Sequence, residues 1–462
     1  MRSRILLPLL RQRYLVDGYG PLIDRVSSFL SPDDRRQAAH WASLMDENRI
    51  WPAGNTLLAG SGEPVRPNCC ILPSPCEDSL DATVARARRL WAARIGIGFD
   101  LSGCRDPVAV LQRLSAENAS VPMEHRPQRG NMATLAITHP EAAQFARAKG
   151  TLDDAERLYN FNISLAVDGD SAWHAATEKG GVLDVAADAC WRGGDPGIVF
   201  LDAIRAAAPY DYNRVSTAYG PLETVVPCGE QAMHANETCS LAAVNLNADA
   251  HWLPGGQLDE HSLAESVQQA VLLLMATRSD RIMDYAGDEA LREASNGLNR
   301  IGLGVLGWAD VLSDRLPRGQ RRYGGPESIA LAARIGAIYR DVARGTSQTF
   351  GARRPITTTC MQPTGGITLL AQQKGFGIEP HFGDEVSVAS HLDMVAAWQP
   401  YVDNAISKTI NLPEDASHAD VRDAFVNARR LGLKLVSVYR TGSRSAEPMA
   451  STRNRKRSCS TC

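Results

Sequence analysis

The sequence predicts an α/β fold in which strands alternate with helices along the chain. Short apolar stretches that are typical of strands recur between longer segments whose apolar residues repeat every three or four positions. The length of 462 residues and the apolar content of 44% are ample for one large buried core. In a fold of this class, the loops at the strand ends carry the chemistry.

The amino-terminal half contains two predicted helices and three predicted strands. Asp33 and Asp34 open a helical stretch that continues to about Glu47, because short acidic side chains cap the first turn of a helix. Four apolar residues mark one face of the second helix: Leu80, Val84, Ala87 and Trp91. The strands are predicted at 96–102, 132–138 and 161–167.

The carboxyl-terminal half contains further amphipathic helices and one more strand. One helical face is formed by Leu263, Val267, Val271 and Leu274. Similar patterns predict helices near 300–312, 327–343, 391–408 and 418–431. The last of these leads into a strand predicted at 433–439.

Charge and hydropathy narrow the range of partners. The formal net charge is −3, from 49 basic and 52 acidic residues, so no global field attracts the chain to nucleic acid or to a membrane surface. No apolar run approaches the roughly 20 residues of a bilayer span, and the start, MRSRILLPLLRQRY, has too short an apolar core for a secretory signal. We therefore expect a cytoplasmic protein that binds small molecules or other proteins.

The segment VVPCGEQAMHANETCSLAAVNL at 225–246 carries the strongest chemical signal. Ten cysteines in a chain of this length are too few for a disulfide scaffold, and an isolated one is usually a buried apolar residue. Pro227 and Gly229, on either side of Cys228, instead favour a tight loop. Glu230 then supplies a nearby proton acceptor, and Cys239 follows further along the segment.

This segment resembles the finger-loop signature of the ribonucleotide reductases, Asn-Pro-Cys-Gly/Ser-Glu, followed at the same spacing by Cys-Asn-Leu-Ala/Gly-Ser-Leu/Ile-Asn-Leu. The resemblance implies that Cys228 becomes a thiyl radical and that Glu230 is the acid/base group. It also implies that Cys239 is one half of a reducing cysteine pair.

The other half of that pair is expected upstream, in a segment that resembles Ala-Cys-Phe-Val-Leu-Pro. The residues from Asn68 to Pro73 match it, with Cys69 in register. Cys70 stands next to Cys69 and remains an alternative partner, because either thiol could be the reductant and the other a core residue.

Further segments resemble the family in the same order, so the resemblance covers most of residues 50–445. They lie at 126–150, 159–167, 299–312, 361–371, 377–382, 403–413 and 434–444. The resemblance implies a ten-stranded α/β barrel with a central finger loop at 51–445. We expect a small N-terminal helical lobe at 1–50 before this barrel and a flexible redox-active tail at 446–462 after it.

A turn of small residues that opens a helix is the candidate phosphate site. Such a turn points free backbone N–H groups and a hydroxyl at an anion, which suits the phosphate of a nucleotide. The proposed substrate contacts are Pro363, Thr364, Gly365, Gly366 and Ile367. Thr56, in an early loop, is a second candidate contact with phosphate or sugar.

Cys459 and Cys462 form a Cys-x-x-Cys pair in the tail. A zinc site would need two more ligands that the tail does not offer, so no metal site is predicted. We interpret the pair as a redox shuttle that exchanges with a disulfide between Cys69 and Cys239. Thioredoxin or glutaredoxin would then reduce the tail.

The resemblance implies an enzyme that makes deoxyribonucleotides from ribonucleoside di- or triphosphates, with oxidation of the cysteine pair. Class I chains carry adjacent tyrosines, whereas this chain has Tyr439 alone at the matching position. No glycyl-radical segment of class III is recognisable. The implied radical source is therefore adenosylcobalamin, as in class II.

Val226 departs from the family, which has Asn at this position. The family amide helps to hold the sugar hydroxyls of the substrate, and valine cannot form that hydrogen bond. Two alternatives therefore stay open: a relative with altered radical chemistry on a nucleotide, and a catalytically silent protein that binds nucleotide or cobalamin. A nucleotide effector and a homodimer also stay open.

Overall fold

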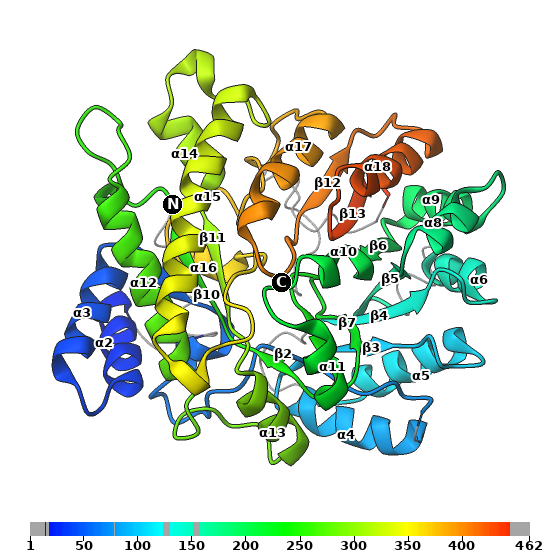
Figure 1. The fold of residues 1–462 in the computed structure, drawn as a ribbon, viewed down its shortest axis with the longest axis horizontal. Helices are drawn as coiled ribbons and strands as arrows, with labels where there is room; N and C mark the ends of the chain where they lie inside the picture. The colour runs from blue at the N-terminus through cyan, green and yellow to red at the C-terminus, as the bar shows by residue number, and fades with distance from the viewer. Residues whose placement is uncertain (1–13, 15–17, 78, 123–129, 151–157, 444–462) are drawn as a thin grey trace.

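The computed structural model describes residues 14, 18–77, 79–122, 130–150 and 158–443 (Figure 1). Its strands are β1 (Ile50–Pro52), β2 (Cys69–Ile71), β3 (Gly96–Asp100), β4 (Asn131–Ala136), β5 (Phe161–Val167), β6 (Gly197–Phe200), β7 (Leu222–Val225), β8 (Ala232–His234), β9 (Thr238–Cys239), β10 (Leu241–Asn245), β11 (Gly302–Leu306), β12 (Thr409–Leu412) and β13 (Leu435–Arg440).

The helices of the amino-terminal part are α2 (Tyr19–Leu30), α3 (Arg35–Asp46), α4 (Leu80–Ala92), α5 (Pro107–Ala119), α6 (Ala142–Ala146), α8 (Asp170–Thr177), α9 (Val182–Gly193), α10 (Leu201–Ala206) and α11 (Tyr212–Tyr219). Those that follow are α12 (Glu260–Thr277), α13 (Glu289–Leu298), α14 (Trp308–Arg315), α15 (Pro326–Gln348), α16 (Gly365–Leu370), α17 (Val388–Trp398) and α18 (His418–Arg430). The alternation of strands and helices confirms the predicted α/β class.

The largest sheet has eight strands in the order β12-β13-β6-β5-β4-β3-β2-β9. The strands from β2 to β6 run parallel to their neighbours, whereas β9 and β13 pair antiparallel with β2 and β6. Parallel strands need helical crossovers, and α4, α5 and α9 supply helices between successive strands of this series. All the parallel strands therefore begin at one edge of the sheet.

A second sheet has three strands in the order β1-β10-β11. Isolated parallel bridges join Leu303 of β11 to Thr359, and Met361 to Ile406, which lies just before β12. At the other end, only Ser240 separates β9 from β10. The two sheets thus approach each other at both ends, and β7 and β8 form a separate hairpin.

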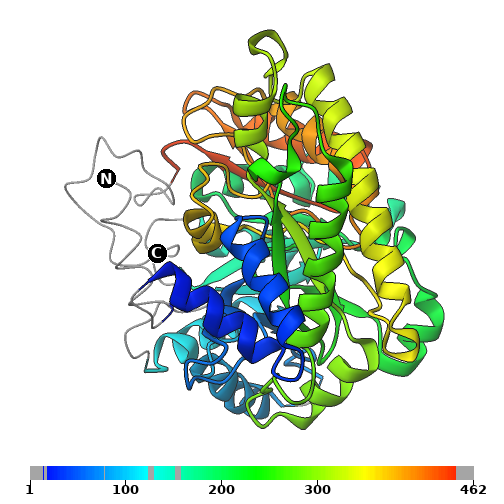
Figure 2. The same cartoon turned by 90° about the vertical axis from the view of Figure 1, so that its left-hand side faces the viewer.

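Helices cover the outside of the sheets. In Figure 1, α12 and α15 lie side by side along one flank, and α8, α9 and α18 gather at the opposite flank. The helices α2 and α3 pack on each other and on α12, as Figure 2 shows. Within the described ranges, none of the helices combines the length and apolar character that a membrane span requires.

Several predicted elements are confirmed at the residue level. α3 begins where expected, because the Asp34 carboxylate accepts hydrogen bonds from the N–H groups of Arg36 and Gln37. α4 contains the predicted apolar face, β5 occupies the predicted range 161–167, and α18 runs directly before β13.

Two predicted helices are wrong in part. The range 300–312 contains β11 before α14, because a parallel strand buried on both faces is an unbroken apolar run with no period of its own. The range 391–408 is helical only to Trp398, where α17 ends. Pro400 follows, and proline cannot donate the backbone hydrogen bond that a longer helix needs.

Candidate active site

The finger loop, residues 226–231, joins β7 to β8. The Val226 N–H donates to the Gln231 carbonyl at 2.9 Å, and the Gly229 N–H donates to the Val226 carbonyl at 2.8 Å. Gly229 has a φ of +85°, which favours glycine. Cys228 is exposed at the tip of this tight turn, whereas Glu230 is buried, so the predicted loop is present.

Two glycines of β3 make room for this loop. A Cβ atom at Gly96 would lie 3.1 Å from Pro227 Cγ and 3.2 Å from Cys69 Sγ. A Cβ atom at Gly98 would lie only 2.3 Å from the Val225 carbonyl oxygen. Because alternate residues of a strand point to the same face, the Gly-x-Gly pattern clears one continuous path for the finger loop.

Residues that the sequence did not identify hold the loop in place. Asn162 of β5 donates from Nδ2 to the Pro227 carbonyl at 2.8 Å. The Ala405 N–H donates to the Glu230 carbonyl at 3.0 Å, and the Asn404 amide donates to the Gln231 side chain. No local pattern reveals these partners, because they are distant from the loop in sequence.

A buried ion pair supports the same region. Arg300 pairs with Glu237 through Nε–Oε1 at 2.9 Å and Nη2–Oε2 at 3.0 Å. Both side chains are almost fully buried, at 1% and 0% exposed. Arg300 also donates to Asn404 Oδ1 at 3.3 Å, so this pair connects β9 to the contacts under the finger loop. Removing one partner would leave a buried charge without compensation.

Cys69 and Cys239 lie directly opposite each other where β2 pairs with β9. A hydrogen bond with the Cys239 thiol, followed by burial, raises the pKa of Cys69 well above its usual range. Glu230 and Cys228 add smaller repulsive contributions, so these two groups also lie within electrostatic reach of Cys69. The four predicted catalytic residues therefore meet in one place.

Cys70 has a different environment. It is fully buried, and burial raises its pKa far above the usual range. The nearest charged groups that act on it are Arg86 and Asp288, which pair with each other through Nε–Oδ2 at 2.6 Å and Nη2–Oδ1 at 2.8 Å. Successive strand residues point to opposite faces, so Cys70 faces away from Cys239.

Glu230 has the electrostatics of a proton acceptor at neutral pH. Its side chain is 2% exposed, and burial raises its pKa to about 7. Its Oε2 atom has no hydrogen-bond partner in the described part of the chain. A buried carboxyl group with a free oxygen can take a proton from a substrate hydroxyl.

A cavity of about 720 Å³ opens at Cys228. Pro227, Cys228 and Gly229 line it from the finger loop, and residues of β5, β6, β12 and β13 form its floor. Pro363 and Gly365 of the predicted phosphate turn also line it. A volume of this size fits a small ligand such as a nucleoside.

The other residues predicted to contact the substrate do not line this cavity. The turn at 363–368 does open a helix, α16, but the Thr364 hydroxyl already contacts Thr368 Oγ1 at 2.6 Å and accepts from the Gly377 N–H at 2.7 Å. Gly366, Ile367 and Thr56 are not among the cavity-lining residues. Thr56 is buried in a 3₁₀ turn at Gly54–Leu58.

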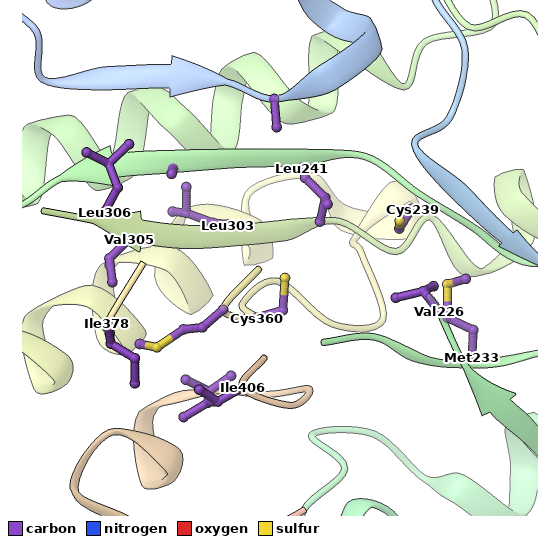
Figure 3. Close-up of a cluster of buried hydrophobic side chains, with 14 of the residues drawn as sticks. Val226, Met233, Cys239, Leu241, Leu303, Val305, Leu306, Cys360, Ile378 and Ile406 are labelled. Carbon is purple, nitrogen blue, oxygen red and sulfur yellow. The ribbon is translucent and has the colours of Figure 1, made fainter. Parts of the chain in front are cut away.

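Val226 is fully buried and belongs to the main apolar core. Figure 3 shows it beside Met233, and Cys239 and Cys360 belong to the same cluster. Its side chain is not part of the cavity wall.

Most of the described cysteines are thiols. Six of the described cysteines are thiols, namely Cys69, Cys70, Cys190, Cys228, Cys239 and Cys360, and a disulfide joins Cys76 to Cys104. This agrees with the expectation that the cysteines do not form a disulfide scaffold. Cys459 and Cys462 lie outside the described residues.

Comparison with known families gives one match over more than half of the chain. The model of the ribonucleotide reductase barrel domain matches residues 178–358 and 378–439. These two ranges include the finger loop, Cys239, β11 and all of β13 except its last residue, Arg440.

Individual relatives agree with this match. The chain is 28% identical to a vitamin B12-dependent ribonucleoside-diphosphate reductase of Mycobacterium tuberculosis (strain CDC 1551 / Oshkosh), over 96% of this chain and 80% of the relative. It is 23% identical to an enzyme of the same name from Thermoplasma acidophilum, over 82% of this chain and 62% of the relative. The fold resembles that of the Actinobacillus ureae class Id ribonucleotide reductase alpha subunit, with a TM-score of 0.74, 14% identity, and coverage of 94% of this chain and 96% of that one.

Proposed function

Because the chain belongs to the ribonucleotide reductase family, we propose that it reduces ribonucleotides to deoxyribonucleotides by thiyl-radical chemistry with adenosylcobalamin as cofactor. The observation that carries the proposal is the meeting of four groups at the edge of the large sheet. These groups are the exposed Cys228, the buried Glu230, and the opposed thiols of Cys69 and Cys239.

The proposed reaction assigns one task to each group. A thiyl radical on Cys228 takes the 3'-hydrogen of the ribose, and Glu230 takes the proton of the 3'-hydroxyl. The 2'-hydroxyl then leaves as water with a proton from the cysteine pair. Cys69 and Cys239 supply two electrons and two protons in total and become a disulfide, and the Cys228 thiol returns the hydrogen to C3'.

The raised pKa values support these assignments. A Glu230 carboxyl with a pKa of about 7 is partly ionised at neutral pH and can both accept and return a proton. Cys69 stays protonated because its pKa lies well above the usual range, so it can deliver a hydrogen to the substrate.

The cavity beside Cys228 fits the nucleoside portion of the cofactor. It reaches the radical-bearing thiol, and its described lining includes no lysine or arginine, so it suits an uncharged group. When bound, adenosylcobalamin supplies a cobalt–carbon bond whose cleavage generates a radical. The protein's part is to hold this group, orient Cys228 and exclude competing donors.

The substrate and redox partners are also part of the proposal. The turn at 363–367 would hold the phosphates of a ribonucleoside di- or triphosphate, because it is a turn of small residues at the amino-terminal end of α16. Cys459 and Cys462 would shuttle electrons from thioredoxin or glutaredoxin. A cytoplasmic location fits this cycle, because that compartment keeps thiols reduced. The proposal also includes a nucleotide effector and a homodimer.

The test is direct. The purified protein is incubated with adenosylcobalamin, dithiothreitol and each ribonucleoside di- and triphosphate, and deoxynucleotide is measured. We expect deoxynucleotide from at least one substrate and none without the cofactor. Release of free base without deoxynucleotide would point to altered radical chemistry, and no turnover would contradict the proposal.

A further inference from the structure

A row of hydroxyl groups crosses the floor of the cavity beside Cys228. Ser164 of β5 is in register with Gly197 of β6, and Ser437 of β13 is in register with Thr409 of β12. β6 and β13 are neighbours, with Val436 paired to Ile198, so the four residues form one line across four strands. All four line the cavity.

The hydroxyl of Ser164 lacks a partner. The residue is 4% exposed, and its side chain forms no hydrogen bond with any residue that the structure describes. The Ser437 and Thr409 hydroxyls likewise form none within those ranges. Because these three residues line the cavity, their hydroxyls are available to donate hydrogen bonds to a ligand and to accept them from it.

Gly197 leaves an open position between two of these hydroxyls. A Cβ atom there would lie 3.1 Å from Ser164 Oγ, 3.1 Å from the Val436 carbonyl oxygen and 3.3 Å from Ser437 Oγ. Any larger residue would fill the space between the serines. Because residue 197 is a glycine, one ligand group in this space can reach the Ser164 hydroxyl, the Ser437 hydroxyl and the Val436 carbonyl oxygen.

The charges around the row favour a neutral ligand. Three ionisable residues in the wall are paired: Asp195 with Lys149 at 2.7 Å, His381 with Asp310 at 3.1 Å, and Glu379 with Lys408. The wall also contains the carboxylate of Asp384, which would repel a phosphate. Among the described lining residues there is no free cation for a phosphate. Hydroxyls that both donate and accept match the vicinal hydroxyls of a sugar.

We propose that Ser164, Ser437 and Thr409, with the opening at Gly197, bind the hydroxyls of a ribosyl group beside Cys228. This inference rests on the proposed function, because two ribosyl groups must approach Cys228 in that reaction. One belongs to the adenosyl group of the cofactor and the other to the ribonucleotide substrate. Cys69 and Cys239, which must touch the substrate, are not in the cavity wall, which favours the adenosyl group as the occupant.

The test measures binding to the full-length protein rather than turnover. Ser164→Ala and Ser437→Ala are compared with the wild type by equilibrium dialysis against adenosylcobalamin, hydroxocobalamin and the ribonucleotide that the wild type reduces. Hydroxocobalamin is the matched ligand control, because it lacks the adenosyl group. Gly197→Ala fills the opening, and Gly345→Ala is its control, because no atom lies within 4 Å of a Cβ placed there.

We expect each serine variant to bind adenosylcobalamin several-fold to about tenfold more weakly, with hydroxocobalamin binding unchanged. Gly197→Ala should weaken binding at least as much, and Gly345→Ala should not. Weaker binding of the ribonucleotide alone would also support a ribosyl site and would assign it to the substrate. Unchanged binding of both ligands in the serine variants, or an equal loss for hydroxocobalamin, would overturn the inference.

Failure of this inference is separable from failure of the proposed function. If the wild type makes deoxynucleotide while the serine variants bind both ligands normally, only the hydroxyl row is refuted. If the wild type binds adenosylcobalamin through these serines but makes no deoxynucleotide, the reaction is refuted and the ribosyl site stands.

Discussion

The two faces of β2 carry neighbouring cysteines with opposite surroundings. Cys69 is half-buried and lies opposite Cys239, within electrostatic reach of Glu230 and Cys228. Cys70 is fully buried beside the Arg86–Asp288 ion pair. Neighbouring residues of a strand project from opposite faces. Cys69 is therefore in a position suited to redox chemistry, whereas Cys70 is in the packed interior.

This difference shows what decides the role of a thiol here. Both cysteines have a raised pKa, so acidity does not distinguish them. What differs is the partner that each face presents: a second thiol for Cys69, and a fixed ion pair for Cys70. The reactivity of a thiol on β2 should therefore depend on the face of the strand from which it projects.

The largest effect on activity is expected at Cys228, the thiol of the finger loop. Cys228→Ala should lower deoxynucleotide formation on the order of 10⁴-fold or more, because the structure offers no other exposed thiol in its described ranges. Deoxynucleotide is measured after incubation with adenosylcobalamin and dithiothreitol. If Cys228→Ala retained substantial turnover, Cys228 would not be the radical-bearing thiol.

A paired substitution compares the two faces directly. Cys69→Ala should lower multiple-turnover reduction by about a thousandfold, since it removes one electron donor of the pair. Cys70→Ala should leave turnover nearly unchanged and lower the free energy of unfolding by roughly 1 kcal/mol, because it removes only a buried sulfur. Turnover and urea denaturation are measured for both proteins. The opposite pattern would assign the redox role to Cys70.

The acid/base group should give a pH signature. Burial raises the Glu230 pKa from 4.5 to about 7, so kcat/KM should increase as pH rises through about 7 and the carboxylate forms. Glu230→Gln should lower the rate by about 100-fold or more and remove this limb of the profile. If the rise of kcat/KM near pH 7 persisted in Glu230→Gln, it would reflect the titration of a different residue.

The same raised pKa has a consequence for stability. The unfolded chain releases this proton near pH 4.5, whereas the folded protein keeps it up to about pH 7. The contribution of Glu230 to stability is therefore present at low pH and is lost as pH rises through this window. Relative to Glu230→Gln, the wild type should lose stability between about pH 4.5 and 7, as urea denaturation at several pH values would show.

The smallest effect on activity is expected at Val226, which lies on the packed side of the finger loop. Val226→Asn should leave the yield of deoxynucleotide similar, since the side chain at this position is buried in the apolar core and does not line the cavity. It should cost about 1–3 kcal/mol of stability if the buried amide finds no partner. A sharp fall in yield without a loss of stability would show that valine is needed for the reaction itself.

The sequence predicted which candidate site residues lie near one another better than it predicted some of the elements around them. Cys69, Cys239, Cys228 and Glu230 do come together, because ordered family segments carry them. β11 was mistaken for part of a helix, since Gly302 and Gly304 lie in a run that is buried on both faces. Asn162, Asn404 and Ser164 were missed because their partners or cavity come from distant strands, which no local pattern reveals.

The central claim is that reduction draws its electrons from Cys69 and Cys239. The most direct measurement uses the pre-reduced protein with adenosylcobalamin and one ribonucleotide, without dithiothreitol or thioredoxin, followed by mapping of the cysteines by mass spectrometry. A variant that ends at Ser458 is used, so that Cys459 and Cys462 cannot exchange with the product. We predict about one deoxynucleotide per chain and a disulfide between Cys69 and Cys239. Deoxynucleotide formation with both thiols still reduced, or a disulfide that contains Cys70 instead, would contradict this account.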